Sequence, residues 1–200
     1  MGAAWGRRLT AVGWRSIGVG FQVAVALIFV VGVLTARVGL VFNAGVALLV
    51  MALPAVLARR QVFLGPGLRT AIGAAVTLHA VGIYAGWYRP GSGFDHLTHG
   101  LSAAVVATVG AATLLAIDRH SPRVSFPGWL VAMVLPVWVT ACGVGWELAE
   151  TALVGLRSVD PRLTVIGQAG LGDTMADLLA DILGGLAVAA WRLLVWRYRG

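Results

Sequence analysis

The sequence predicts an all-α fold, a polytopic membrane bundle of six transmembrane helices that forms one integral membrane domain over residues 1–200. Of the 200 residues, 59% are hydrophobic and only 12% are charged, with a mean hydropathy of +0.88. This composition is too apolar for a water-soluble domain. The apolar residues also fall in runs long enough to cross a bilayer. Many of the 27 glycines lie inside these runs, which is typical of helices that pack closely in lipid.

Six apolar runs of spanning length follow one another along the chain. The first comes after Arg7, Arg8 and Arg15, as in a signal peptide. Its length of about 20 residues and the lack of a small-residue cleavage site instead predict a retained span. Only a short turn near Arg37 separates the first two runs, so a five-span arrangement stays open as an alternative. Pro136 lies inside the fifth and longest run and predicts a kink or a tilt there. The runs cover about 17–36, 40–58, 70–88, 95–117, 126–156 and 173–195.

The basic residues predict the orientation of the chain. All fifteen are arginine and the formal net charge is +7, a balance that would suggest nucleic acid as a partner only if the chain were soluble. We therefore exclude nucleic acid and expect membrane lipids as partners. With six spans and the N-terminus inside, eleven arginines are cytoplasmic and four, Arg37, Arg89, Arg157 and Arg162, lie outside. Because arginine favours the cytoplasmic side, we predict a multi-pass protein of the cell membrane with both termini in the cytoplasm.

Acidic side chains are concentrated in the second half of the chain. Six of the eight lie in or at the ends of apolar runs, where an ionised carboxylate facing lipid costs roughly 3 kcal/mol. These carboxylates should therefore face one another, water or a cation. They recur at spacings of three or four residues, which places them and two histidines on one face of each helix. The sets are Asp95, His96 and His99; Glu147 and Glu150; and Asp173, Asp177 and Asp181.

The predicted topology brings these three polar faces to the outer side of the membrane. Carboxylate and imidazole groups on facing helices are ligands for zinc, manganese or iron. We predict that one such divalent ion is bound and that Glu147 or Glu150 acts as a general base toward a metal-bound water. The predicted ligands are Asp95, His96, His99, Glu150, Asp173, Asp177 and Asp181.

Simpler structural roles are available for several of these residues. Asp95 and Asp173 each follow a glycine-containing turn and precede a long apolar run, so either could cap a helix N-terminus. We interpret His79 as a hydrogen-bonded packing residue and His120 as a solvated loop residue. The polar connection 157–172 is long enough to fold back over the bundle as an outer cap.

Three functions fit the acidic pattern. The leading interpretation is a metal-dependent hydrolase or transferase acting on a lipid-linked or envelope substrate. The second is a proton- or cation-coupled transporter in which the aspartate ladder carries the ion, although residues 182–190 offer no polar continuation. The third is a structural polar clasp without chemistry. The pattern leaves open whether the protein is an enzyme.

Three stretches of this sequence resemble a known family. They are FDHLTHGLSA at 94–103, GVGWELAETAL at 143–153 and GLGDTMADLLADILGGL at 170–186. Together they resemble the YjdF-like inner-membrane proteins of unknown function, with their D-x-x-x-H, W-E-x-x-E and G-D-T-x-x-D motifs, and the match covers about residues 94–190. The resemblance implies a shared site at Asp95, His99, Glu147, Glu150, Asp173, Asp177 and Asp181.

The same stretches are more distantly similar to the VanZ-like family. Asp181 stands where that family has asparagine and Glu150 where it has glutamine, so this site is the more acidic. The link of VanZ-like members to altered glycopeptide susceptibility implies chemistry at the outer leaflet.

Overall fold

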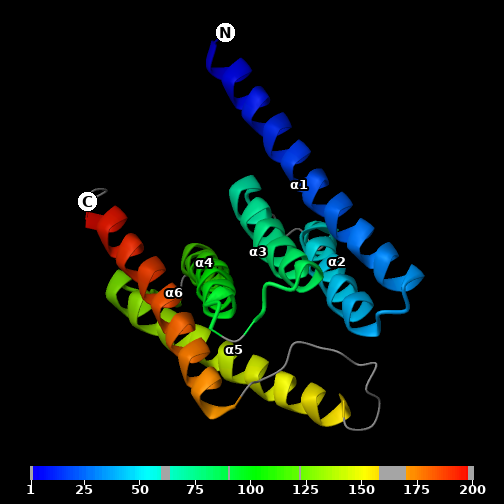
Figure 1. Cartoon of the computed structure of the whole chain (residues 1–200). Coiled ribbons are helices and arrows are strands. Elements are labelled where there is room, and N and C mark those ends of the chain that lie inside the picture. Colours follow the sequence, from blue (N-terminus) through cyan, green and yellow to red (C-terminus); the bar gives the residue numbers. More distant parts are fainter. Residues whose placement is uncertain (1, 60–63, 90, 122, 158–169, 198–200) are drawn as a thin grey trace. The chain divides into compact units, whose positions relative to one another are not determined.

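The computed structural model describes residues 2–59, 64–89, 91–121, 123–157 and 170–197, and all regular secondary structure in these ranges is α-helical. The all-α prediction is thus confirmed, with six helices in the described part of the chain (Figure 1). They are α1 (Gly2–Leu34), α2 (Val38–Arg59), α3 (Pro66–Ala85), α4 (Phe94–His120), α5 (Gly128–Arg157) and α6 (Leu171–Arg197).

Five of these helices, α1 to α5, are long and apolar enough to cross a membrane. α6 has 27 residues but is not among the five. It carries Asp173, Asp177, Asp181 and Arg192, and its role as a sixth transmembrane helix stays a prediction. α1 and α2 are separate helices, because the chain turns between them at Ala36 with φ 53° and the Arg37 amide donates back to the Gly32 carbonyl at 2.9 Å.

The chain groups into two compact units. The first comprises residues 1–88 and 156–166 and holds α1, α2 and α3; the second comprises residues 89–155 and 167–200 and holds α4, α6 and nearly all of α5. The single membrane domain expected from the sequence stays a prediction.

The first unit is built around apolar contacts. α1, α2 and α3 all pack against one another around a buried cluster that includes Val25, Leu40, Ala44 and Ala80. At one place this unit contains a polar network. His79 Nε2 lies 3.4 Å from Asn43 Oδ1, and His79 Nδ1 lies 2.5 Å from the Tyr88 hydroxyl oxygen. The interpretation of His79 as a hydrogen-bonded packing residue is confirmed.

In the second unit, small residues let the helices approach closely. A Cβ atom added at Gly184 of α6 would overlap the Gly100 carbonyl oxygen of α4, and one added at Gly185 would overlap Val139 of α5. Small residues at helix contacts are typical of membrane bundles. Residues later in α4 contact residues later in α6, so these two helices run parallel. The contacts between α5 and α6 follow the opposite order, so α5 runs antiparallel to them.

The helix ends correct three interpretations. α4 begins at Phe94 after Gly93 and has no side-chain cap hydrogen bond, so Asp95 lies in the first turn and is not the N-cap. α6 begins at Leu171, which places Asp173 inside that helix as well. His120 is the last residue of α4, with Nδ1 2.8 Å from the Ala116 carbonyl oxygen, because the helix continues beyond the predicted end at residue 117.

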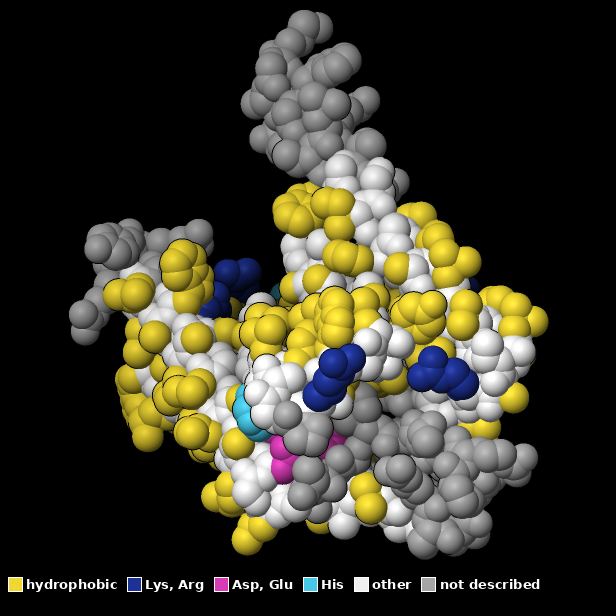
Figure 2. All heavy atoms as spheres, in the orientation of Figure 1, with side chains coloured by type: hydrophobic (Ala, Val, Ile, Leu, Met, Phe, Trp, Pro, Cys, Tyr) yellow, Lys and Arg dark blue, Asp and Glu magenta, His cyan; other side chains and the backbone are white. Residues whose placement is uncertain are grey.

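The surface of the described residues is largely apolar. Hydrophobic side chains are spread over much of the described surface in the view of Figure 2, whereas acidic side chains show in one small area. Large side chains such as Leu49 (73% exposed) and Val137 (70% exposed) point outward. Exposed apolar area of this extent fits contact with lipid. Most of the connection predicted to cap the bundle, at 157–172, lies outside the described residues.

Candidate functional site

The predicted site residues all belong to the second unit, where they lie on α4, α5 and α6. Five of these ionisable side chains are almost completely buried. The exposed fractions are 8% for His99, 4% for Glu147, 5% for Glu150, 1% for Asp177 and 5% for Asp181. Burying ionised groups is unfavourable unless each finds a partner of opposite charge or hydrogen-bonding partners, so the arrangement of these groups decides what the cluster can do.

Two histidine–carboxylate contacts connect α4 to α6. His96 Nδ1 lies 2.7 Å from Asp177 Oδ1, and His99 Nδ1 lies 3.3 Å from Asp181 Oδ1. The two histidines are about one turn apart on α4, and so are the two aspartates on α6, so parallel helices can form both contacts at once. The sequence spacing thus becomes a matched pair of polar contacts across the interface.

The second nitrogen of His99 faces a different pair of carboxylates. Its Nε2 is 3.8 Å from Asp95 Oδ1 and 3.9 Å from Glu147 Oε1. If Nδ1 donates its hydrogen to Asp181, the neutral ring presents the Nε2 lone pair toward Asp95 and Glu147. A lone pair facing two carboxylates is unfavourable unless a proton or a cation lies between them. The imidazole is therefore in a position to share a positive ion with its neighbours.

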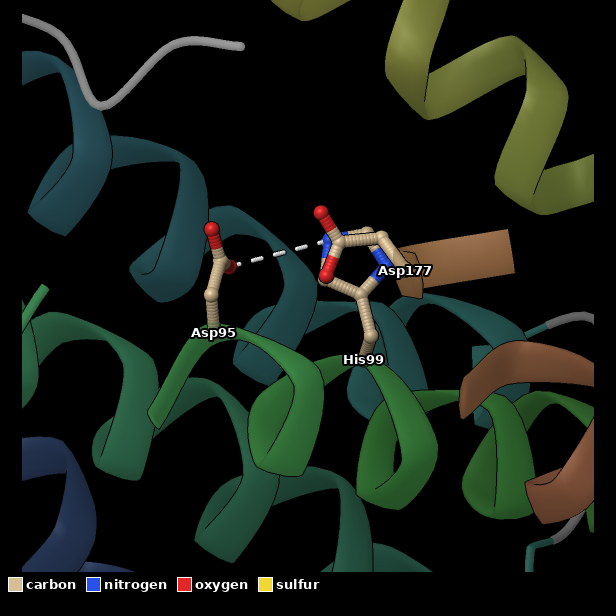
Figure 3. Close-up of side chains that lie close together, drawn as sticks. All are labelled: Asp95, His99 and Asp177. Carbon is tan, nitrogen blue, oxygen red and sulfur yellow. Dashed lines mark ion pairs between the residues drawn. The ribbon is translucent and has the colours of Figure 1, made fainter. Parts of the chain in front are cut away.

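Asp95, His99 and Asp177 form the group best placed to hold a metal ion. Each offers one ligand atom, and the three atoms lie within 4.8 Å of one another. Figure 3 shows Asp95 and His99 rising from successive turns of α4, with Asp177 extending from α6 toward the imidazole. Ligand atoms about 2.1 Å from a tetrahedral zinc ion are about 3.4 Å from each other, so the ligand atoms would have to approach one another by at most about 1.4 Å on binding.

The other predicted ligands surround this group in less direct positions. Glu150 Oε1 accepts a hydrogen bond of 2.8 Å from Trp146 Nε1, and its carboxylate interacts electrostatically with Asp95, Glu147 and His99. Asp173 lies in the first turn of α6 and interacts electrostatically with Asp95. The structure thus brings all the predicted site residues into one neighbourhood and distinguishes an inner group of three from its surroundings.

Two residues that position the cluster are absent from the predicted set. Trp146 holds Glu150 through its indole, and Gly143 leaves room for the Asp181 carboxylate, which a Cβ atom at residue 143 would overlap. Helical spacing could have indicated both, since Trp146 precedes Glu150 by four residues and Gly143 precedes Glu147 by four. The need for a residue without a side chain at position 143 depends on Asp181 of α6, however, and cannot be read from the sequence of α5 alone.

Comparison with known proteins identifies the family of this chain. A family model described as "Predicted membrane protein (DUF2238)" matches residues 17–198. This is the YjdF-like family, so that resemblance is confirmed, and it extends beyond the 94–190 region in which the motifs lie. The VanZ-like similarity is not shown by this match. No curated protein and no solved structure matches the chain.

Proposed function

Because the chain belongs to the family of predicted membrane proteins DUF2238, we propose that it is a multi-pass protein of the cell membrane whose buried carboxylate–histidine cluster binds one divalent metal ion. The observation that carries this proposal is the position of His99, whose Nδ1 lies 3.3 Å from Asp181 and whose Nε2 faces Asp95 and Glu147. A carboxylate that hydrogen-bonds one imidazole nitrogen while the other binds metal is a recurring arrangement in metalloproteins.

The proposed roles follow from these contacts. Asp95, His99 and Asp177 bind the ion directly, and Asp181 orients His99 from behind. His96 holds Asp177 through the 2.7 Å contact with Oδ1. Two carboxylates and one imidazole suit zinc, manganese or iron. Three protein ligands leave at least one coordination position for water or substrate, which is the arrangement of catalytic metal sites.

The chemistry proposed for the bound ion is hydrolysis or group transfer. A divalent ion lowers the pKa of a bound water and makes it a nucleophile near neutral pH. Glu147 is the better placed general base, because its Oε1 lies 3.9 Å from His99 Nε2, the proposed metal-binding atom. The arginine distribution favours an outward-facing site with cytoplasmic termini, and a lipid-linked or envelope substrate would reach it there.

A structural clasp is the second candidate function. The observation in its favour is the pair of histidine–carboxylate contacts that join α4 to α6, which could hold the helices without any ion. A transporter has less support. Between the cluster and the far ends of α4 and α6, the described interface is filled by Ala103, Ala107 and Val139, which offer no polar path for an ion.

Metal analysis of the purified full-length protein tests the leading proposal. We expect about one zinc, manganese or iron ion per chain, lost in His99→Ala and in Asp177→Asn. His79→Ala is the matched control, since it removes a hydrogen-bonded histidine of the first unit and should leave the metal content unchanged. Folded wild-type protein that contains no metal and binds none on addition would exclude the metal site.

Thermal unfolding in detergent separates the metal site from the clasp. An ion that binds only the folded state, present at 100 times its dissociation constant, stabilises it by about 2.7 kcal/mol. We expect a chelator to lower the unfolding temperature of the wild type and to have no effect on His99→Ala. If the chelator leaves the wild type unchanged while His99→Ala is strongly destabilised, the clasp is the correct function.

A further inference from the structure

A groove lies at the end of α4 and α6 remote from the acidic cluster. Its volume is about 630 Å³, and all its lining residues come from these two helices of the second unit. They lie between residues 108 and 120 of α4 and between 187 and 192 of α6, whereas the cluster occupies the opposite ends of the same helices. The groove thus forms a second candidate site, and none of its side chains belongs to the cluster.

The lining of the groove changes from apolar to cationic along its length. Ala112, Leu115 and Val188 line one part, and Arg119 and Arg192 line the other. Asp118, next to Arg119 in the sequence, is not among the lining residues, and its Oδ1 accepts a 2.7 Å hydrogen bond from the Phe126 amide.

The change from apolar to cationic lining can be compared with the layers of a bilayer around α4. α4 is apolar enough to span a membrane from Phe94 to His120, so Arg119 in its last turn lies at the level of the lipid headgroups. Leu115 and Ala111 then lie about 6 and 12 Å deeper, at 1.5 Å rise per residue. Trp191, which also lines the groove, is of the residue type enriched at the membrane interface. The cationic end would meet headgroups and the apolar part would meet acyl chains.

We propose that this groove binds an anionic phospholipid, with the phosphate between Arg119 and Arg192 and an acyl chain along Ala112, Leu115 and Val188. Guanidinium groups form paired hydrogen bonds with phosphate oxygens, and basic pockets between membrane helices recognise lipid headgroups. The volume falls in the range of small-molecule sites. The proposal is independent of the metal site, since the two sites share no side chain.

Lipid binding to the purified full-length protein, followed by native mass spectrometry, tests this inference. The probes are phosphatidylglycerol, phosphatidylcholine and inorganic phosphate, each titrated separately. We expect wild-type protein to retain phosphatidylglycerol in preference to phosphatidylcholine, and Arg119→Gln/Arg192→Gln to weaken retention by roughly 10- to 30-fold. The matched control is Arg69→Gln/Arg123→Gln, which removes the same charge from exposed positions outside the groove and should bind like the wild type.

A variant that fills the apolar part of the groove without changing its charge tests the proposed binding of the acyl chain. Ala112→Phe places a ring in the groove and should abolish retention of phosphatidylglycerol, while thermal unfolding reports whether the variant is folded. Equal binding of the two lipids, or equal losses in the groove and control double variants, would overturn the proposal. It would also be overturned if inorganic phosphate bound with the same arginine dependence while no lipid was retained.

Discussion

The two helical units of this protein solve the problem of packing apolar helices in different ways. In the first unit, α1 to α3 contain no acidic residue, and the described polar network joins His79 to the neutral side chains of Asn43 and Tyr88. In the second unit, α4 to α6 bury four carboxylates and the imidazole of His99. The two units therefore have different kinds of interior: the first is packed through apolar and neutral polar contacts, and the second contains ionisable groups whose charges must be balanced.

This difference predicts where the molecule tolerates change. When buried apolar atoms are removed by substitution, the free energy of unfolding falls roughly in proportion to the number of atoms lost. A buried charge cluster responds more sharply, because removing one partner leaves the others uncompensated in a medium of low dielectric constant. Substitutions of the same kind in the two units should therefore have unequal effects, and matched pairs of variants can measure the inequality.

The largest difference is expected between buried His99 and partly buried His79. His99→Leu leaves Asp95, Asp181 and Glu147 without their imidazole partner and should lower the free energy of unfolding by about 3–5 kcal/mol. His79→Leu removes hydrogen bonds to neutral groups and should cost about 1–3 kcal/mol. Unfolding of both variants in the same detergent measures the gap. Equal losses would mean that the two interiors are held in the same way.

A smaller difference is expected between two helical glycines. Gly143→Ala places a methyl group against the Asp181 carboxylate, which must move away from His99, and the cost should be about 2–3 kcal/mol. A Cβ atom at Gly45 would lie 3.5 Å from the Phe29 ring, an ordinary contact. Gly45→Ala should therefore be neutral or stabilise α2 by up to about 1 kcal/mol. Thermal unfolding and metal content should both distinguish this pair. Destabilisation by Gly45→Ala would contradict the comparison.

The smallest effects are expected for two aromatic hydrogen-bond donors. Trp146→Phe removes the donor to Glu150 and should cost about 1.5 kcal/mol, since bonds to a carboxylate are stronger than neutral ones. Tyr88→Phe removes the hydroxyl beside His79 and should cost about 1 kcal/mol. Denaturant unfolding of the two variants, each against the wild type, provides the measurement. A larger loss for Tyr88→Phe would show that charge in the second unit adds nothing to its hydrogen bonds.

Much of the architecture was predictable from local patterns. Hydropathy located all six helices, because a chain in lipid must satisfy its backbone hydrogen bonds internally and forms helices wherever apolar runs are long enough. Helical periodicity likewise placed Asp95 with His99, and Asp177 with Asp181, on single faces. The ends were less predictable. α4 continues to His120, and it begins at Phe94 without the side-chain cap expected from Asp95. The turns that end a helix depend on a few residues with little hydropathy signal.

The chain by itself therefore determined that the protein is helical, where its six helices lie, and that its acids and histidines lie on shared helix faces, because these properties depend only on residue type and spacing along one helix. Only the tertiary structure decided that His99 turns one nitrogen to Asp181 and the other toward Asp95 and Glu147. It also decided that Gly143 makes room for Asp181 and that a groove opens at the other end of α4 and α6. Those features depend on the rotation and depth of one helix against another, and contacts between side chains far apart in the sequence set both.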